Sequence, residues 1–267
     1  MKVLCIIPAR YESTRFPGKA LAEIDGIPMV VRVAHNAAAA FGRESVVVAT
    51  DDDRIYRAAL TGGFAAVQLR EYPKVEEDER ELCPTGTDRV ALAAIEVDRS
   101  DPIDPLETII VNVQGDEPNV DAQAIRRVAW CKMMHHRDMF NEDGEQTIHN
   151  RVACAISYIA DNEDPTDPDL VKVAFDDDND LTEASRKDLL TPYRQVGLYA
   201  FSMMDLEAYA AAAPSVESAS IEILRFHEIG IKVRVCNVPG EPVAVDRPQH
   251  IAKVEEQLRM RREGAKI

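Results

Sequence analysis

Positive charge is in deficit in this sequence, because acidic residues outnumber basic ones. The chain of 267 residues has 31 Lys and Arg against 47 Asp and Glu, which gives a formal net charge of -16 at pH 7. Binding to nucleic-acid phosphates needs a basic surface, so this balance argues against a non-specific nucleic-acid binder. The same negative excess disfavours an anionic membrane surface as a partner.

Long apolar runs are also missing, because none approaches the roughly 20 residues of a membrane-spanning helix. The opening residues, MKVLCIIPAR, pass from a short apolar stretch into a charged loop without a small-residue cleavage site. We therefore expect a first strand there and no signal peptide. The five cysteines are widely spaced and form no CxxC pair, which argues against a zinc site and against a disulfide framework. Free thiols in a reducing cytoplasm fit this pattern.

Short β-branched runs separated by helix-like stretches predict the fold. Val3–Pro8, Ser45–Thr50 and Thr108–Gln114 are apolar on both faces, as buried parallel strands are. The alternation of such strands with helical stretches predicts a doubly wound, mostly parallel α/β sheet covered by helices. Further strands are expected at Arg151–Ile159, Leu170–Phe175, Val196–Phe201 and Ile231–Val238. Helices are expected at Met29–Phe41, Asp52–Leu60, Asp88–Val97, Asp121–Met139, Met204–Ala212, Ser218–Gly230 and Arg247–Glu263. We expect one domain over residues 1–267, with a β-rich, lid-like elaboration in its second half.

A basic loop, Pro8–Lys19, directly follows the first expected strand. Ligands of open α/β sheets bind at the carboxyl ends of strands, so this loop is well placed for binding. Its three cations, Arg10, Arg15 and Lys19, point to a polyphosphate, which guanidinium and ammonium groups bind well. The loop lacks the GxxxxGK[ST] pattern of a Walker A motif. A merely solvated basic loop fits less well in so acidic a chain.

Three more segments carry polar groups in suggestive positions. Asp116, in Asn112–Pro118, follows an apolar strand and could hold Mg²⁺ opposite a polyphosphate, although it could also belong to an ordinary strand-to-helix turn. Asp246 precedes Pro248 and, from the residues alone, is favoured as a helix cap over a second metal ligand. The segment Pro84–Arg89 predicts equally a capped helix N-terminus or a seat for polar ligand groups.

In order and spacing, these motifs resemble the 3-deoxy-manno-octulosonate (Kdo) cytidylyltransferases. The matching segments are PARYESTRFPGK, VATDD, TGTDR, VNVQGDEP, VKV, GLYAF and VDRP, and the resemblance runs from Met1 to about Arg259. It implies a nucleotidyltransferase-type sheet with a dimerisation or lid elaboration. It also implies transfer of CMP from CTP to a 3-deoxy sugar acid with release of pyrophosphate. Mg²⁺, a cytoplasmic homodimer and a role in lipopolysaccharide biosynthesis are implied as well.

The resemblance assigns roles to particular residues. Catalysis would fall to Arg10, Lys19, Asp116 and Asp246, of which Asp116 and Asp246 would hold the metal, so that Asp246 becomes more than a cap. The nucleotide would be bound by Arg10, Arg15, Lys19, Thr85, Thr87 and Arg89. The sugar acid would be bound by Arg15, Gln114, Gln195, Tyr199 and Glu222.

The sugar-acid half departs from the family pattern. Gln195 stands where the family has His, and Ile223 where it has Gln beside the retained Glu222. Ser185 and Arg186 correspond to a family Ser-Arg pair at a different spacing. Replacement of Gln by Ile removes a hydrogen-bond donor and acceptor and would change which hydroxyls of the sugar acid are recognised. The acceptor is therefore either Kdo or a modified ulosonic acid. Other acids, such as a phosphonate, and a non-catalytic nucleotide-binding homologue are the remaining alternatives. Residues 72–82 and 137–150 are expected to be surface insertions.

Overall fold

A mixed sheet forms the centre of this computed structural model, which describes residues 1–69, 85–136, 151–160, 163–187 and 189–264. Its main strands lie in the order β11-β7-β10-β6-β1-β4-β5. Every pairing among them is parallel except those of β10, which runs against both β6 and β7. The bounds are β1 (Lys2–Ala9), β4 (Val46–Thr50), β5 (Ala65–Gln68), β6 (Thr108–Val113), β7 (Arg151–Tyr158), β10 (Tyr193–Phe201) and β11 (Lys232–Asn237). The predicted doubly wound, mostly parallel sheet is confirmed.

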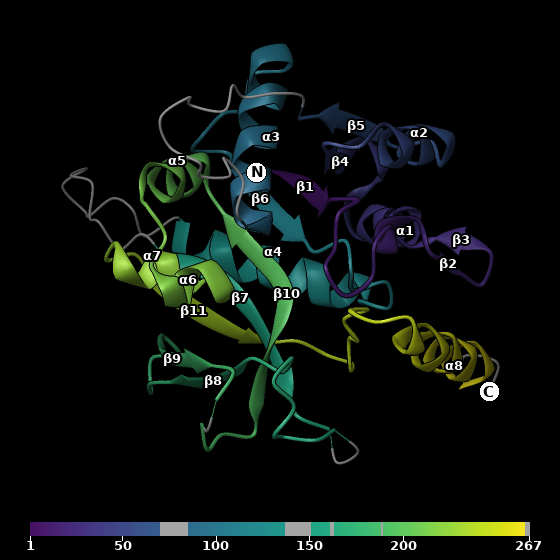
Figure 1. Ribbon diagram of the computed structural model, residues 1–267. Helices are drawn as coiled ribbons and strands as arrows, with labels where there is room; N and C mark the ends of the chain where they lie inside the picture. The colour runs from purple at the N-terminus through teal and green to yellow at the C-terminus, as the bar shows by residue number, and fades with distance from the viewer. Residues whose placement is uncertain (70–84, 137–150, 161–162, 188, 265–267) are drawn as a thin grey trace.

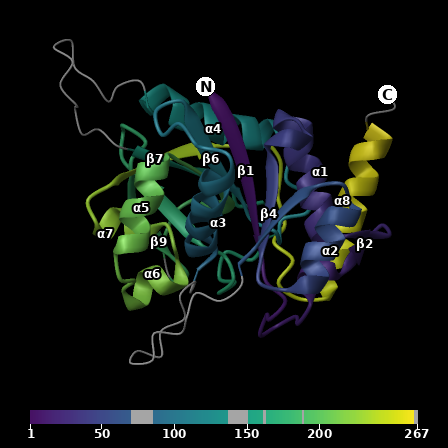
Figure 2. The same cartoon turned by 90° about the horizontal axis from the view of Figure 1, so that it is seen from above.

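Helices cover both faces of the sheet (Figures 1 and 2). On one face, α1 (Met29–Phe41), α2 (Asp53–Thr61) and α4 (Ala122–His136) pack on the strands. On the other face lie α3 (Gly86–Ser100) and α5 (Met203–Ala211). β1 shows why two cores form: Cys5 and Ile7 face the first, and Leu4 and Ile6 face the second. Both faces are apolar, as the uninterrupted runs in the sequence predict.

Smaller elements surround this frame. β2 (Glu23–Ile24) pairs with β3 (Ile27–Pro28), and β8 (Lys172–Phe175) pairs with β9 (Leu181–Ser185) beside the start of β10. Two short helices, α6 (Val216–Ser220) and α7 (Leu224–Glu228), precede β11. The last helix, α8 (Gln249–Gly264), packs Val254 into a small apolar cluster with Ile24 and Met29. The remaining elements are the single 3-10 turns η1 (Lys19–Leu21) and η2 (Arg43–Ser45).

The structure differs from the sequence-based expectation at several elements, and the short β2–β3 pair is one that was not predicted. β5 was not predicted, and neither was β9, whose sequence LTEAS is largely polar and half exposed. The acidic stretch Asp176–Asp180 forms the turn of the β8–β9 hairpin, with Asn179 in a left-handed conformation at φ +59°. The single helix predicted over Ser218–Gly230 is wrong: the backbone leaves the helical region at Ile221 (φ -127°, ψ 87°), which separates α6 from α7. The two predicted insertions and Cys83 lie outside the described residues.

Candidate active site

A cavity of about 390 Å³ opens where β1 and β6 end and β10 begins. Because β10 is antiparallel to β6, its first residues lie at the edge where β6 ends, and the Gln114 N–H donates to the Gly197 carbonyl at 3.0 Å. Two glycines permit this close approach. A Cβ on Gly197 would lie 2.9 Å from the Gln114 side chain, and one on Gly115 would lie 2.8 Å from the Pro8 carbonyl. The sheet edge therefore gathers segments that are distant in sequence.

The basic loop after β1 supplies one side of the cavity. Gly18, at φ +72°, turns the chain so that its N–H donates to the Tyr11 carbonyl at 2.8 Å. Lys19 follows at once, and its Nζ lies 2.7 Å from Asp116 Oδ2 and 3.2 Å from Asp246 Oδ1. Burial opposes the charged form of Lys19, but the two neighbouring carboxylates outweigh it and raise the pKa of the ammonium. Arg10 also lines the cavity.

Asp246 reaches the cavity from the loop between β11 and α8. The Val245 N–H donates to the Asp116 carbonyl at 2.8 Å, which brings the two aspartates together although they are 130 positions apart in the sequence. Besides Lys19, Asp246 Oδ1 lies 3.0 Å from Arg15 Nη2. These contacts give Asp246 a place in the cavity, so a helix cap for α8 is not needed to explain it.

The start of α3 forms a second wall of the cavity. Thr85 caps the helix in a capping box with Asp88, so the predicted capped N-terminus is confirmed. Thr85 also lines the cavity, and its hydroxyl lies 3.0 Å from the Tyr209 hydroxyl. Thr87 is buried and is not among the described residues lining the cavity, whereas Arg89 lines it and pairs with Asp51 at 3.4 Å.

Behind this wall, Asp88 forms a buried ion pair with Arg225 of α7. The Nη1–Oδ1 distance is 2.6 Å, and Arg225 is 1% exposed. The guanidinium also stacks on the Tyr209 ring, with its central carbon 3.9 Å from the ring centroid. Through Arg225, the first turn of α3 is thus held against both α5 and α7.

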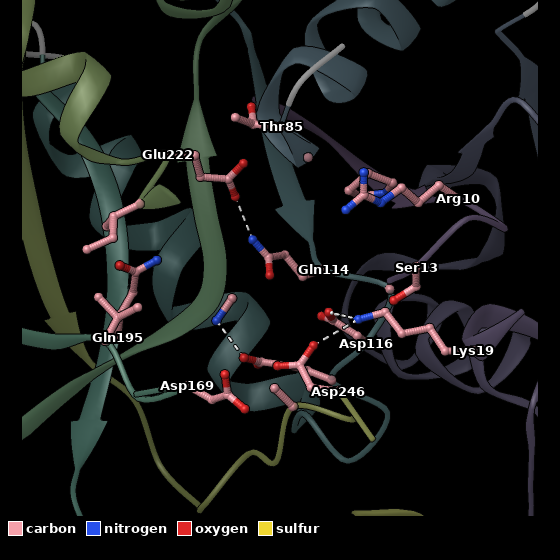
Figure 3. Close-up of a pocket in the computed structure, with 18 of the residues that line it drawn as sticks. Arg10, Ser13, Lys19, Thr85, Gln114, Asp116, Asp169, Gln195, Glu222 and Asp246 are labelled. Carbon is pink, nitrogen blue, oxygen red and sulfur yellow. Dashed lines mark hydrogen bonds and ion pairs between the residues drawn. The ribbon is translucent and has the colours of Figure 1, made fainter. Parts of the chain in front are cut away.

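The opposite side of the cavity carries amide and carboxylate groups. Figure 3 shows two facing groups of labelled side chains: Arg10, Ser13 and Lys19 on one side, and Gln114, Gln195 and Glu222 on the other. Gln114 Nε2 donates to Glu222 Oε1 at 2.5 Å, and the Thr87 N–H donates to Glu222 Oε2 at 2.9 Å. Burial raises the pKa of Glu222 despite these hydrogen bonds. The break between α6 and α7 is what places Glu222 here.

The two departures from the family pattern have different environments. Gln195 lines the cavity and donates through Nε2 to the hydroxyl of Tyr199, while its Oε1 is buried without a hydrogen-bond partner among the described residues. Ile223 is 1% exposed and packs in the apolar core with Tyr199. Ile221 lines the cavity instead. The expectation that Ile223 reads the acceptor is therefore not supported by its position, and Gln195 is the departure that faces the cavity.

Several cavity residues were missed by sequence reasoning. Glu117 accepts a hydrogen bond from the Gly197 N–H at 2.8 Å, and burial raises its pKa to about 7. Its place next to Asp116 in the segment VNVQGDEP is the sequence feature that could have identified it. Asp169 pairs with Arg15, but no signal distinguished it from the other acids of its polar segment. Arg186, which the resemblance named together with Ser185 but without a role, also lines the cavity.

Asp116 and Asp246 are suited to hold a divalent cation. Their oxygens converge on one point, now taken by the Lys19 ammonium, and carboxylate oxygens are the ligands Mg²⁺ prefers. No cluster of three or more His, Cys, Asp or Glu with metal-binding geometry occurs among the residues that the structure describes. A site of two carboxylates completed by substrate phosphates is the usual arrangement for Mg²⁺.

Comparison with known proteins matches nearly the whole chain to a family. The family model described as Cytidylyltransferase matches residues 4–267. The chain belongs to this cytidylyltransferase family. This cytidylyltransferase is 35% identical to a 3-deoxy-manno-octulosonate cytidylyltransferase from Geobacter metallireducens, over 97% of this chain and 98% of the relative. It is 30% identical to an 8-amino-3,8-dideoxy-manno-octulosonate cytidylyltransferase from Shewanella baltica, over 97% and 99%.

Solved structures agree with this assignment. The structure of CMP:2-keto-3-deoxy-manno-octonic acid synthetase complexed with CTP superposes with a TM-score of 0.74 at 29% identity, covering 98% of this chain and 100% of that one. A putative glucose-1-phosphate thymidylyltransferase from Bacillus anthracis shares the fold at 12% identity, with a TM-score of 0.63. No helix among the described residues of this cytidylyltransferase is long and apolar enough to cross a membrane.

Proposed function

We propose that this cytidylyltransferase transfers CMP from CTP to a 3-deoxy sugar acid and releases pyrophosphate. The observation that carries the proposal is the division of one cavity into a cationic side and an amide-carboxylate side, with Asp116 and Asp246 between them. A triphosphate and a polyhydroxylated acid need these two kinds of surface. The names of the relatives support the same substrates.

The chemistry follows from charge and position. Both substrates are anions, so the residues mainly neutralise charge and hold the acceptor's anomeric hydroxyl in line with the α-phosphorus. Arg10, Arg15 and Lys19 would bind the triphosphate and stabilise the departing pyrophosphate. Asp116 and Asp246 would hold Mg²⁺, which when bound neutralises phosphate charge and favours ionisation of the attacking hydroxyl. Thr85 and Arg89 would contact the nucleotide from the start of α3, with Thr87 behind them.

The acceptor would lie against Gln114, Gln195, Tyr199 and Glu222. These groups offer hydrogen bonds from neutral amides, a hydroxyl and a buried carboxylate, a set suited to sugar hydroxyls. Kdo and 8-amino-3,8-dideoxy-manno-octulosonate are the two acceptors that the relatives suggest. The second is a specific candidate because Gln195, at the cavity, departs from the resembled pattern.

The setting of the enzyme is part of the proposal. A cytoplasmic location fits a reaction that consumes CTP, and the described cysteines Cys5, Cys131, Cys154 and Cys236 are free thiols. A homodimer and a role in lipopolysaccharide biosynthesis come from the family resemblance.

A pyrophosphate-release assay tests the proposal. The purified chain is incubated with Mg²⁺ and CTP, UTP or ATP, each against Kdo, its 8-amino analogue and unrelated small acids, including phosphonates. Turnover with CTP and a 3-deoxy-octulosonate is the expected result. Turnover with only another acid would point to the related nucleotidyltransferase, and none with any acid to a non-catalytic homologue.

A further inference from the structure

Six charged side chains of alternating sign form a continuous series at the cavity, and all of them except Arg247 line it. Neighbouring charges lie 3.7 Å apart for the Arg247–Asp169 pair, 3.0 Å for Arg15–Asp246, 3.2 Å for Asp246–Lys19 and 2.7 Å for Lys19–Asp116, and Arg15 also contacts Asp169. In order, the series is Arg247, Asp169, Arg15, Asp246, Lys19 and Asp116. The proposed reaction gives roles to the last four members but none to Asp169.

Asp169 links three segments of the chain. It lies between β7 and β8, and its carboxylate contacts Arg15 of the loop after β1 and Arg247 of the loop before α8. Its main-chain carbonyl accepts a hydrogen bond from Arg186 at 2.9 Å. The next two residues, Leu170 and Val171, line the cavity. The Asp169 side chain is 25% exposed, so it remains open to competition from an incoming ligand.

Arg15 is the residue for which Asp169 and an incoming phosphate would compete. Its Nη1 contacts Asp169 and its Nη2 contacts Asp246, so both terminal nitrogens of the guanidinium already face carboxylates. Phosphate and carboxylate oxygens bind a guanidinium through the same forked N–H groups. A phosphate that approaches the terminal nitrogens of Arg15 competes with these carboxylates for their N–H groups.

We propose that Asp169 takes the place of a phosphate oxygen at Arg15 in the nucleotide-free enzyme, and that the triphosphate displaces it. The inference rests on the proposed function in one respect, that Arg15 binds the triphosphate. After displacement, Asp169 can keep an ion pair with Arg247, whose Nε lies 3.7 Å from the other carboxylate oxygen of Asp169. Nucleotide binding thus breaks the contact between the basic loop and the segment that carries Leu170 and Val171. Asp169 is accordingly a residue that lowers the affinity of the enzyme for the triphosphate.

The test measures equilibrium binding without turnover. CTP and inorganic triphosphate are titrated calorimetrically into the full chain with no acceptor present, for the wild type and for Asp169→Asn. Loss of an exposed ion pair is worth about 0.5–1 kcal/mol, so both ligands should bind about two- to fivefold more tightly to the variant. Asp178→Asn is the matched control, because it removes the same charge at an exposed turn between β8 and β9. It should leave both affinities unchanged.

A second pair of variants shows whether Arg15 mediates the effect. In an Arg15→Met background, Asp169→Asn should no longer tighten binding. The inference is overturned if Asp169→Asn binds triphosphate as the wild type does or more weakly. It is also overturned if Asp178→Asn produces the same gain, or if the gain persists without Arg15. A wild-type chain that binds no CTP would contradict the proposed function instead. Thermal melting confirms that each variant is folded.

Discussion

Gln114 donates a hydrogen bond to Glu222 at 2.5 Å, and this contact joins the end of β6 to the break between α6 and α7. The second carboxylate oxygen of Glu222 accepts from the Thr87 N–H at the first turn of α3. Glu222 therefore contacts both the expected acceptor side and the helix that carries Thr85 and Arg89. Removing the Glu222 side chain should therefore weaken binding of the sugar acid more than binding of CTP.

We expect Glu222→Ala to raise the KM for the sugar acid by about tenfold or more, since a hydrogen bond to a charged group contributes about 1.5–3 kcal/mol. The KM for CTP should change much less. Steady-state kinetics with each substrate varied in turn measures both constants. Glu217→Ala, an exposed position on α6, is the control and should change neither. A larger effect on CTP than on the acid would refute the placement of the acceptor at Glu222.

The buried Glu222 carboxyl should also make stability depend on pH. Its pKa in the folded chain is raised by burial, so folding favours the protonated form. The stabilisation is fully present below the unfolded pKa of about 4.3 and is lost as the pH rises through the folded value. Urea unfolding of Glu222→Gln should therefore show a smaller fall in the free energy of unfolding between pH 5 and pH 8 than the wild type. An equal fall in both proteins would show that Glu222 is not responsible.

The Arg225–Asp88 pair should be important for stability. Arg225→Met leaves Asp88 buried without its cation, which typically costs about 3–5 kcal/mol. Arg99→Met removes an exposed pair with Glu96 and should cost no more than about 1 kcal/mol. Urea unfolding of the two variants compares the costs directly. Equal losses would mean that burial of the Asp88 pair adds nothing.

Local patterns in the sequence predicted part of this architecture. Strands β1, β4 and β6 are continuous apolar runs, and Arg10, Arg15 and Lys19 are close together in the sequence, so both features are visible in short windows. β9 has no such signal, because a half-exposed hairpin strand tolerates polar residues such as Thr182 and Glu183.

Tertiary contacts decide the rest of the site. The helix predicted across Ile221–Ile223 is interrupted where Glu222 is held by Gln114 and Thr87, two residues more than 100 positions away. The Asp169–Arg15 contact joins residues 154 positions apart. No window of sequence contains both members of such a pair, and only the family resemblance indicated that Glu222 belongs to the site.

Lys19 and Asp116 should be needed for turnover. Removing one preorganised charged group from the reacting phosphates typically lowers kcat by about 10²–10³-fold, and we expect at least this loss for Lys19→Met and for Asp116→Asn. Circular dichroism should show that both variants keep the fold. Full activity of Asp116→Asn at saturating Mg²⁺ would rule out its role as a metal ligand.

Identification of the reaction product by mass spectrometry tests the central claim most directly. The enzyme is incubated with CTP, Mg²⁺ and either Kdo or 8-amino-3,8-dideoxy-manno-octulosonate. The account predicts a CMP-linked sugar acid and an equimolar amount of pyrophosphate from at least one of them, with the product greatly reduced in Asp116→Asn. Hydrolysis of CTP without a CMP-linked product, or no reaction with either acid by an enzyme that binds CTP, would contradict it.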